Sequence, residues 1–203
     1  MAGTLLSILD LQLGGHAADA ATLGRSLYEH AVHFAWLAAD PSDARMQEWR
    51  KHDLQQRLKA DTNMARFGAG FYTDEQRAYV EAQVDSLVGK NLVLEQLAMA
   101  ADDSWVPRTP GLIAGSTKSF AGLYASLYRH SSGTAHPTLL GLNRVTDDLS
   151  PSRRRIRLEG AEVGAGPYGM ATIVFGLVLQ VSAQALGWPL PSEIEEIFER
   201  HPT

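Results

Sequence analysis

Apolar residues recur along most of the chain at spacings of three and four, which is the pattern of helices that bury one face. The clearest run covers residues 18–39 and has two largely apolar faces, which predicts a helix surrounded by protein on most sides. The Asp40-Pro41 pair ends it, because a residue before proline avoids the helical conformation. The first face comprises Leu23, Leu27, His30, Phe34 and Leu37, and the second Arg25, Glu29, Val32 and Trp36.

Further helices are predicted after this one. One starts at Thr73-Asp74-Glu75-Gln76, a capping box in which Thr73 and Gln76 satisfy free backbone amides at the helix start. Alternating strand patterns are almost absent, so we expect an all-α fold, an up-and-down helical bundle of about six to seven helices. The other segments are 42–66, 116–131, a shorter one to about 143, 168–186 and 192–200, while the capped helix extends over 73–99.

A chain of 203 residues suits a single domain, so we assign residues 1–203 to one helical domain. Its expected core covers about 18–145, with the C-terminal helices of 168–200 packed on it. Residues 146–166 are polar, basic and rich in glycine, which predicts a long loop with a short extended piece at 155–158.

Composition narrows the possible functions. The formal charge is −5, so no global basic field attracts nucleic acid, and an RNA contact would need a local patch. The absence of cysteine excludes disulfides, thiolate metal sites and cysteine nucleophiles, and is consistent with a reducing compartment.

Two segments bear on membranes and export. The apolar segment 170–186 contains Gln180, Ser182 and Gln184 and is shorter than the roughly 20 apolar residues of a spanning helix, so we interpret it as a core helix. The first residues lack the basic region and apolar stretch of a signal peptide. We therefore expect a cytoplasmic protein without membrane contact.

A first polar cluster lies within the helix of residues 18–39. Arg25 and Glu29 are four residues apart and share a helix face. Two interpretations stay open, a structural salt bridge that ties two helices together and a polar pocket inside the bundle. His30 and His33 are only three apart, and a metal site there would need carboxylates from other helices that the sequence does not reveal. We predict neither a metal nor another cofactor.

A second cluster covers residues 128–137. Arg129 and His136 are seven apart, so a continuous helix would point them the same way, although Gly133 lies between them. An arginine binds phosphate and a histidine can move the proton of a ribose 2′-hydroxyl, so the pair is a minimal site for RNA cleavage without a metal. The alternative is a polar helix end, in which hydroxyl groups such as that of Ser132 and the His136 ring cap the turn before Pro137.

A third cluster is basic. Arg153, Arg154 and Arg155 form a local positive patch that would contact RNA phosphates, or else belong to a solvated loop. The nucleotide-binding, zinc-protease and hydrolase motifs that we sought are absent from the sequence.

The segment from Arg129 to His136 resembles the Arg-x(4–6)-His motif of HEPN domains, and Arg25 to His30 also satisfies that spacing. The resemblance implies a small α-helical bundle that is often dimeric, and in many cases a ribonuclease of a toxin–antitoxin or phage-defence system. Such motifs usually lie in an unbroken helix, whereas Gly133 and Pro137 bracket part of this one.

The wider layout resembles an uncharacterised bacterial family of helical proteins. The matching pieces are Arg25-Ser-Leu-Tyr-Glu29, Trp36-Leu-Ala-Ala-Asp40-Pro41, Tyr128 and His136-Pro137, over about residues 20–140. This resemblance implies that Arg25, Glu29, Tyr128 and His136 form one polar cluster between two helices, with no known activity.

Two functional hypotheses follow. In the first, the chain is a metal-independent endoribonuclease that acts as a homodimer on RNA, with His136 as general acid or base and Arg129 stabilising the phosphorane. Arg25, Glu29, His30, Tyr128 and Ser132 would support this site, and an antitoxin or defence component is the expected protein partner. In the second, the chain is a non-catalytic binding or sensor protein, in which a buried Arg/Glu/His cluster is structural.

Overall fold

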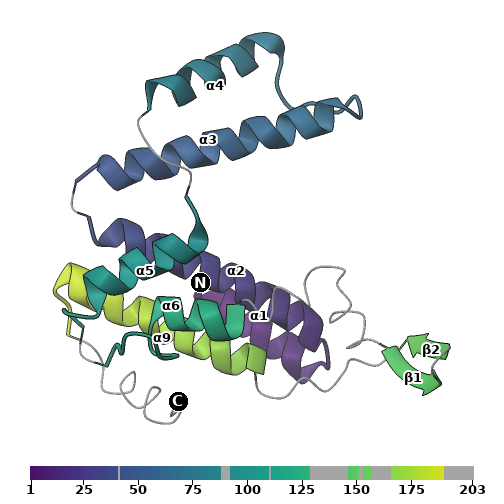
Figure 1. The fold of residues 1–203 in the computed structure, drawn as a ribbon, viewed down its shortest axis with the longest axis vertical. Helices are drawn as coiled ribbons and strands as arrows, with labels where there is room; N and C mark the ends of the chain where they lie inside the picture. The colour runs from purple at the N-terminus through teal and green to yellow at the C-terminus, as the bar shows by residue number, and fades with distance from the viewer. Residues whose placement is uncertain are drawn as a thin grey trace. The chain divides into compact units, whose positions relative to one another are not determined.

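The computed structural model describes residues 1–40, 42–87, 92–109, 111–128, 146–150, 153–156 and 166–189. It confirms the predicted all-α class, because helices account for most of the described residues (Figure 1). The α-helices are α1 (Ala2–Leu13), α2 (Ala17–Ala38), α3 (Ala44–Ala65), α4 (Asp74–Ser86), α5 (Leu94–Trp105), α6 (Phe120–Leu123) and α9 (Gly166–Leu186), and a π-helical turn, η1 (Tyr124–Tyr128), continues α6.

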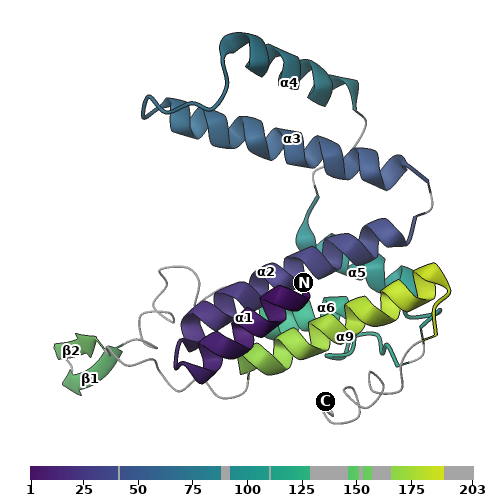
Figure 2. The same cartoon turned by 180° about the vertical axis from the view of Figure 1, so that it is seen from behind.

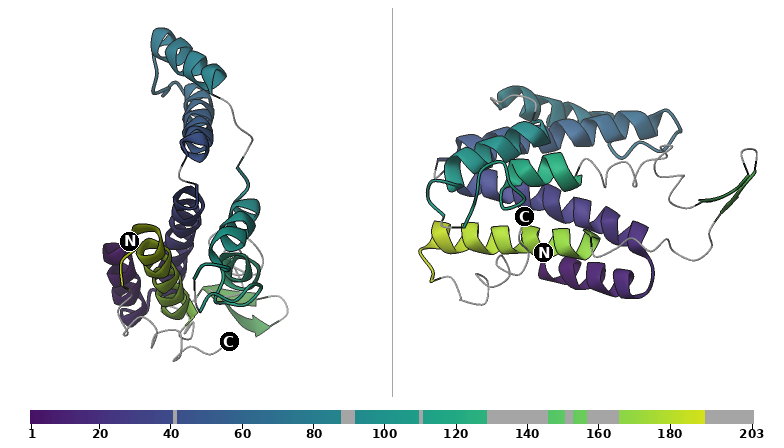
Figure 3. Two further views of the ribbon diagram at one scale, coloured as in Figure 1. Left: turned by 90° about the vertical axis from the view of Figure 1, so that its left-hand side faces the viewer. Right: turned by 60° about the horizontal axis from the view of Figure 1, so that its bottom comes forward.

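The chain divides into two compact units. The larger unit combines residues 1–39 with 97–203, and the smaller unit covers residues 40–96. In the larger unit, α9 packs against both α2 and α1, so the two ends of the sequence share one core (Figures 2 and 3). The expected packing of a C-terminal helix on the rest of the bundle is therefore present for α9.

Burial on α2 agrees with the two predicted faces only in part, since Val32 and Trp36 of the second face are buried, whereas the first face is mixed. Leu27 is buried, but His30 is exposed and Phe34 is 37% exposed. The face that packs runs instead through small residues such as Ala20, Gly24 and Ala31. Small side chains allow close approach of neighbouring helices. A search for large apolar residues assigns little weight to alanine, which is why the small residues of the buried face were not predicted from the sequence.

The helix α9 is the one described helix that is long and apolar enough to cross a membrane by length and composition. Its stretch Tyr168–Leu186 has a mean hydropathy of 1.6 and is 44% buried. Core helices meet the same criteria, and Val174, Leu177 and Val181 of α9 are fully buried in the larger unit. The helix therefore behaves as the core element that the sequence indicated.

The smaller unit is a hairpin of α3 and α4. The predicted capping box is confirmed, since the Thr73 side chain accepts from the Gln76 amide and the Gln76 side chain accepts from Thr73 N. The prediction of one helix over residues 73–99 was wrong. Leu87 has an extended backbone that ends α4, and a separate helix, α5, starts at Leu94.

Two segments of the predicted loop, residues 146–150 and 153–156, form strands. Strands β1 (Thr146–Ser150) and β2 (Arg153–Ile156) pair antiparallel, so the extended piece lies earlier than the predicted 155–158. The short helix expected to about residue 143 and the one expected over 192–200 lie outside the described residues.

The helix predicted over residues 116–131 starts later, at Phe120, with the Ser119 side chain accepting from Gly122 N as its cap. Residues before it form a turn that folds back tightly. A Cβ atom at Gly122 would overlap the Ser116 carbonyl, so a glycine is required at this close approach.

Candidate functional site

A hydrogen-bonded cluster of Arg25, Glu29 and Tyr128 joins α2 to η1 in the larger unit. Arg25 and Glu29 lie one turn apart on α2, and Arg25 Nε donates to Glu29 Oε1 at 3.0 Å. The Tyr128 hydroxyl donates to the same Glu29 oxygen at 2.7 Å and accepts from Arg25 Nε at 3.1 Å. The intrahelical ion pair predicted from the spacing is therefore one side of a three-residue cluster that spans two helical elements.

Aromatic rings surround the Tyr128 side chain. Its ring centroid lies 5.2 Å from those of Tyr28 and Tyr124, and the Tyr124 ring is nearly parallel to it. The Arg25 guanidinium carbon lies 5.0 Å from the centroid of the Tyr128 ring, a distance typical of cation–π contacts. These contacts fix the ring orientation and hence the direction of the Tyr128 hydroxyl.

The position of η1 depends on α5. The Asp102 carboxylate accepts from the amides of Phe120 and Ala121 at 2.8 and 2.9 Å, which satisfies the start of α6. The Tyr28 hydroxyl donates to the Phe120 carbonyl at 2.7 Å. Together these bonds hold α6, and with it η1, beside α2. The π-helical conformation at residues 124–128 is itself notable, because such turns are frequent at functional sites.

The pKa values of two members of the cluster, Arg25 and Tyr128, are raised above their ordinary values. Burial alone would lower the pKa of the Arg25 guanidinium, but the bonds to Glu29 and Tyr128 outweigh it and raise this pKa. Burial, reinforced by the hydrogen bond to Glu29, raises the pKa of Tyr128 to about 12. At neutral pH Arg25 is therefore a cation and Tyr128 a neutral phenol, so neither moves a proton.

The cluster is only partly buried. The side chains of Arg25 and Glu29 are 23% and 38% exposed, whereas Tyr128 is buried. Arg25 therefore brings positive charge to the edge of the core. The pair ties two helical elements together, as the first interpretation expected, and it lies at the solvent-accessible edge of the bundle.

The histidines of α2 have separate local bonds. His30 Nδ1 lies 2.6 Å from the Ser26 carbonyl and His33 Nδ1 lies 2.7 Å from the Glu29 carbonyl. In both cases Nδ1 is the protonated nitrogen, because a carbonyl only accepts. Among the residues that the structure describes, no three His, Asp or Glu side chains are arranged to hold a metal.

Several predicted site residues are not placed by the structure. Arg129, Ser132 and His136 lie outside the described residues. Arg153, Arg154 and Arg155 form most of β2, where the backbone register sets Arg154 opposite Asp148 and Arg155 opposite Asp147. Two of the three arginines of the basic patch thus have an acidic residue at the opposing strand position.

Three residues of the site were not identified from the sequence, namely Tyr28, Tyr124 and Asp102. Tyr124 and Tyr128 are four apart, which was an available signal for ring stacking on a helix. No local signal exists for Asp102, because its partners lie 18 and 19 residues away.

The geometry defines a class of protein, an all-α fold with a polar and aromatic cluster where α2 meets η1. The sequence pattern of the DUF5677 family, described as a family of unknown function, matches residues 2–153. The chain therefore belongs to this family, and the matched range includes all three residues of the cluster. No curated protein and no solved structure matches the chain.

Proposed function

We propose that this chain is a metal-independent endoribonuclease whose site combines Arg129 and His136 with the cluster on α2. The supporting observation is the position of Tyr128, the residue that directly precedes Arg129. Its hydroxyl contacts both Glu29 and Arg25, so the residue before the Arg-x(4–6)-His segment is part of the cluster. In this proposal the phosphate binds where both the Arg25 cation and the motif reach it.

The proposed reaction is internal transesterification. His136 takes the proton of a ribose 2′-hydroxyl, the 2′-oxygen attacks the adjacent phosphorus, and the bond to the 5′-oxygen breaks. The leaving 5′-oxygen receives a proton from solvent water, which gives a 2′,3′-cyclic phosphate and a 5′-hydroxyl. Arg129 stabilises the charge of the phosphorane, and Arg25, held by Glu29 and Tyr128, adds positive charge beside it.

We also propose an oligomeric state, a cellular context and further RNA contacts for the enzyme. The enzyme acts as a homodimer in the cytoplasm, in a toxin–antitoxin or phage-defence context with a protein partner. Ser132 and His30 line the site, and Arg153, Arg154 and Arg155 contribute phosphate contacts. The register opposite Asp147 and Asp148 lowers the formal charge of the paired strands, so we expect this contribution to be modest.

The test is cleavage of labelled single-stranded RNA by purified protein in the presence of EDTA. His136→Ala is expected to lower the rate by about 100-fold or more, the usual contribution of a general acid or base. His16→Ala is the matched control, because His16 is an exposed histidine of the larger unit that the proposal does not place in the site. Equal rates of cleavage by the wild type and His136→Ala would contradict the proposal.

A second candidate is a non-catalytic binding or sensor protein with a structural cluster. It is favoured by the way Arg25, Glu29 and Tyr128 satisfy one another, with two of them unable to move protons at neutral pH. Absence of cleavage by the wild type on a range of RNAs, together with a loss of stability in Glu29→Gln, would favour this function.

A further inference from the structure

The α3–α4 hairpin has almost no apolar core. Among its described residues only one side chain, that of Asp61, is buried. Paired helices are normally stable because they bury an apolar stripe against another element, so this hairpin has apolar surface left to cover. Its exposed large apolar residues are Met46, Trp49, Met64, Phe67, Phe71 and Tyr79.

The tip of the hairpin, residues 66–73, is nevertheless held firmly. The Asp61 carboxylate accepts from the amides of Phe71 and Tyr72 and is paired with the Arg77 guanidinium. Burial opposes its ionisation, but these bonds outweigh burial and lower the pKa of Asp61. Gly68 adopts φ +72°, the left-handed conformation that ends α3. A buried charge thus fixes a turn on the surface.

This fixed turn presents two aromatic rings to solvent. Phe67 is 85% exposed and Phe71 is 63% exposed. An ordered turn with two exposed phenylalanines is unusual for a surface without a partner, since exposed apolar patches commonly mark interaction sites.

A hollow lies next to this tip, along the first turns of α4. Its volume is about 360 Å³, and it is lined by Tyr72, Glu75, Gln76, Tyr79 and Val80. A cavity of about 150 Å³ is enough to hold benzene, so the hollow has room for a phenylalanine ring. Within the hairpin, a surface that offers an aromatic ring therefore adjoins a surface that can receive one.

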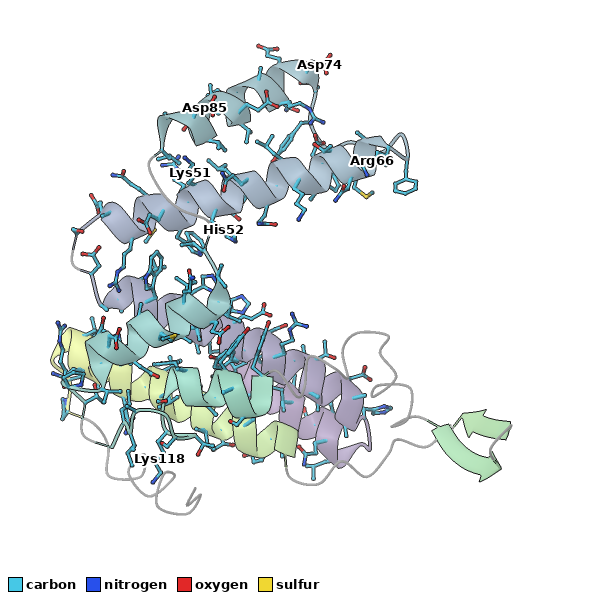
Figure 4. The ribbon with its side chains drawn as sticks, in the orientation of Figure 1. Lys51, His52, Arg66, Asp74, Asp85 and Lys118 are labelled. Carbon is cyan, nitrogen blue, oxygen red and sulfur yellow. The ribbon has the colours of Figure 1, made fainter. Side chains whose placement is uncertain are left out.

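Charges at the same end of the hairpin are complementary as well. Arg66 adjoins Phe67, and Glu75 lines the hollow with Asp74 beside it. Figure 4 shows Arg66 and Asp74 on the two helices at this end. In the described part of the chain none of these three makes an ion pair, whereas Lys51 at the other end donates to the Leu87 carbonyl. The tip is thus cationic and apolar, and the hollow anionic and aromatic.

We propose that the hairpin tip is a homodimer interface, in which Phe67 of each copy enters the hollow of a second copy while Arg66 pairs with Glu75. Two adjacent complementary surfaces on one chain are satisfied together by a two-fold pairing, in which each contact occurs twice. This inference does not depend on the ribonuclease proposal, because it uses none of the residues of that site.

The experiment measures the mass of the full-length protein by light scattering and its dissociation constant by sedimentation. The wild type is expected to be a dimer. Phe67→Ala raises the dissociation constant by about tenfold or more, since aromatic residues at the centre of an interface carry much of its energy. Arg66→Glu and Glu75→Arg each give monomers, because each variant places like charges together in both contacts.

A mixture of Arg66→Glu with Glu75→Arg restores opposite charges in both contacts of the mixed pair and is expected to form a heterodimer. Lys59→Glu, an exposed charge reversal two turns earlier on α3, is the matched control and stays dimeric. Circular dichroism of each variant checks that the helices remain folded. A monomeric wild type, a dimer indifferent to Phe67→Ala and Arg66→Glu, or a mixture that stays monomeric would each overturn the proposal.

Discussion

The Tyr128 hydroxyl donates a hydrogen bond to Glu29 Oε1 at 2.7 Å, although the two residues are 99 positions apart in the chain. This bond converts an ion pair within one helix into a contact between two helical elements. It also aligns the Arg25 side chain, whose Nε atom bonds both partners.

Removing this hydroxyl should cost stability. Tyr128→Phe keeps the ring and its contacts with Tyr28 and Tyr124, but removes the bonds to Glu29 and Arg25. We expect a loss of about 1 to 2 kcal/mol in the free energy of unfolding, since a hydrogen bond to a charged group contributes at that level. Urea unfolding measures it.

Tyr124→Phe is the matched control for this variant. It removes a hydroxyl from a stacked neighbour for which the described residues provide no hydrogen bond, so its unfolding free energy should stay close to that of the wild type. Equal losses in both variants would show that the cluster contributes nothing specific.

The same cluster predicts a response to alkaline pH. Burial, followed by the bond to Glu29, raises the pKa of Tyr128 from 10.0 to about 12. The folded protein therefore holds this proton more tightly than the unfolded chain. The resulting stability is fully present below pH 10.0 and is lost as the pH rises through about 12.

Urea unfolding over that alkaline range should thus show a steeper decline for the wild type than for Tyr128→Phe. Ultraviolet titration of the folded protein should show one fewer late-ionising tyrosine in the variant. Superimposable stability profiles of the two proteins would contradict the expected coupling.

Removing the Asp102 carboxylate, which holds the start of α6, should lower the stability of the protein. In Asp102→Ala the amides of Phe120 and Ala121 lose their acceptor while partly buried, so we expect a loss of about 2 to 4 kcal/mol. Asp102→Asn keeps one acceptor oxygen and should lose less. Chemical denaturation of the three proteins gives the order wild type, Asn, Ala.

The stability that Asp102 contributes should depend on pH in the opposite direction to that of a carboxylate whose pKa is lowered by folding. Burial raises its pKa, although the Ala121 and Phe120 amides act against the shift. Its contribution to stability is therefore present below the ordinary value of 3.8 and is lost as the pH rises through the folded-state value. Asp102→Asn does not ionise and should lack this pH dependence. A difference in the free energy of unfolding between it and the wild type that stays constant across acidic pH would contradict the expectation.

The hydrogen bonds of Asp61 are expected to keep the hairpin tip ordered. Asp61→Ala removes the acceptor of the Phe71 and Tyr72 amides, so hydrogen exchange at these amides should accelerate. Because the pKa of Asp61 is lowered, the protection is present above 3.8 and is lost as the pH falls through the folded-state value. Asp53→Ala removes only a solvent-exposed pair with Arg57 and should leave the tip unchanged.

Local sequence signals predicted those parts of the fold that depend on neighbouring residues. The capping box at Thr73 and Gln76 formed as expected, because both partners lie within one turn. The break after Ser86 was missed, since glycine inside an otherwise helical pattern reduces helix stability without fixing where the chain turns.

Two of the three residues of the described cluster could be predicted in the same way. The spacing of Arg25 and Glu29 put them on one face of α2, and the helix brought them together. That Tyr128 reaches them depends on Asp102 holding the start of α6 and on the π-helical turn that follows, and neither has a signature in the sequence.

The sequence by itself determined that this chain is helical, where its capped helix begins, and which charges share a turn, because backbone propensity and periodicity act over a few residues. Only the tertiary structure decided which residues of the two predicted faces of α2 are buried, how the Tyr128 side chain reaches Glu29, and that the α3–α4 hairpin forms a unit of its own. These features depend on packing between segments that are distant in the sequence, and no local pattern of residues encodes which surfaces pack together.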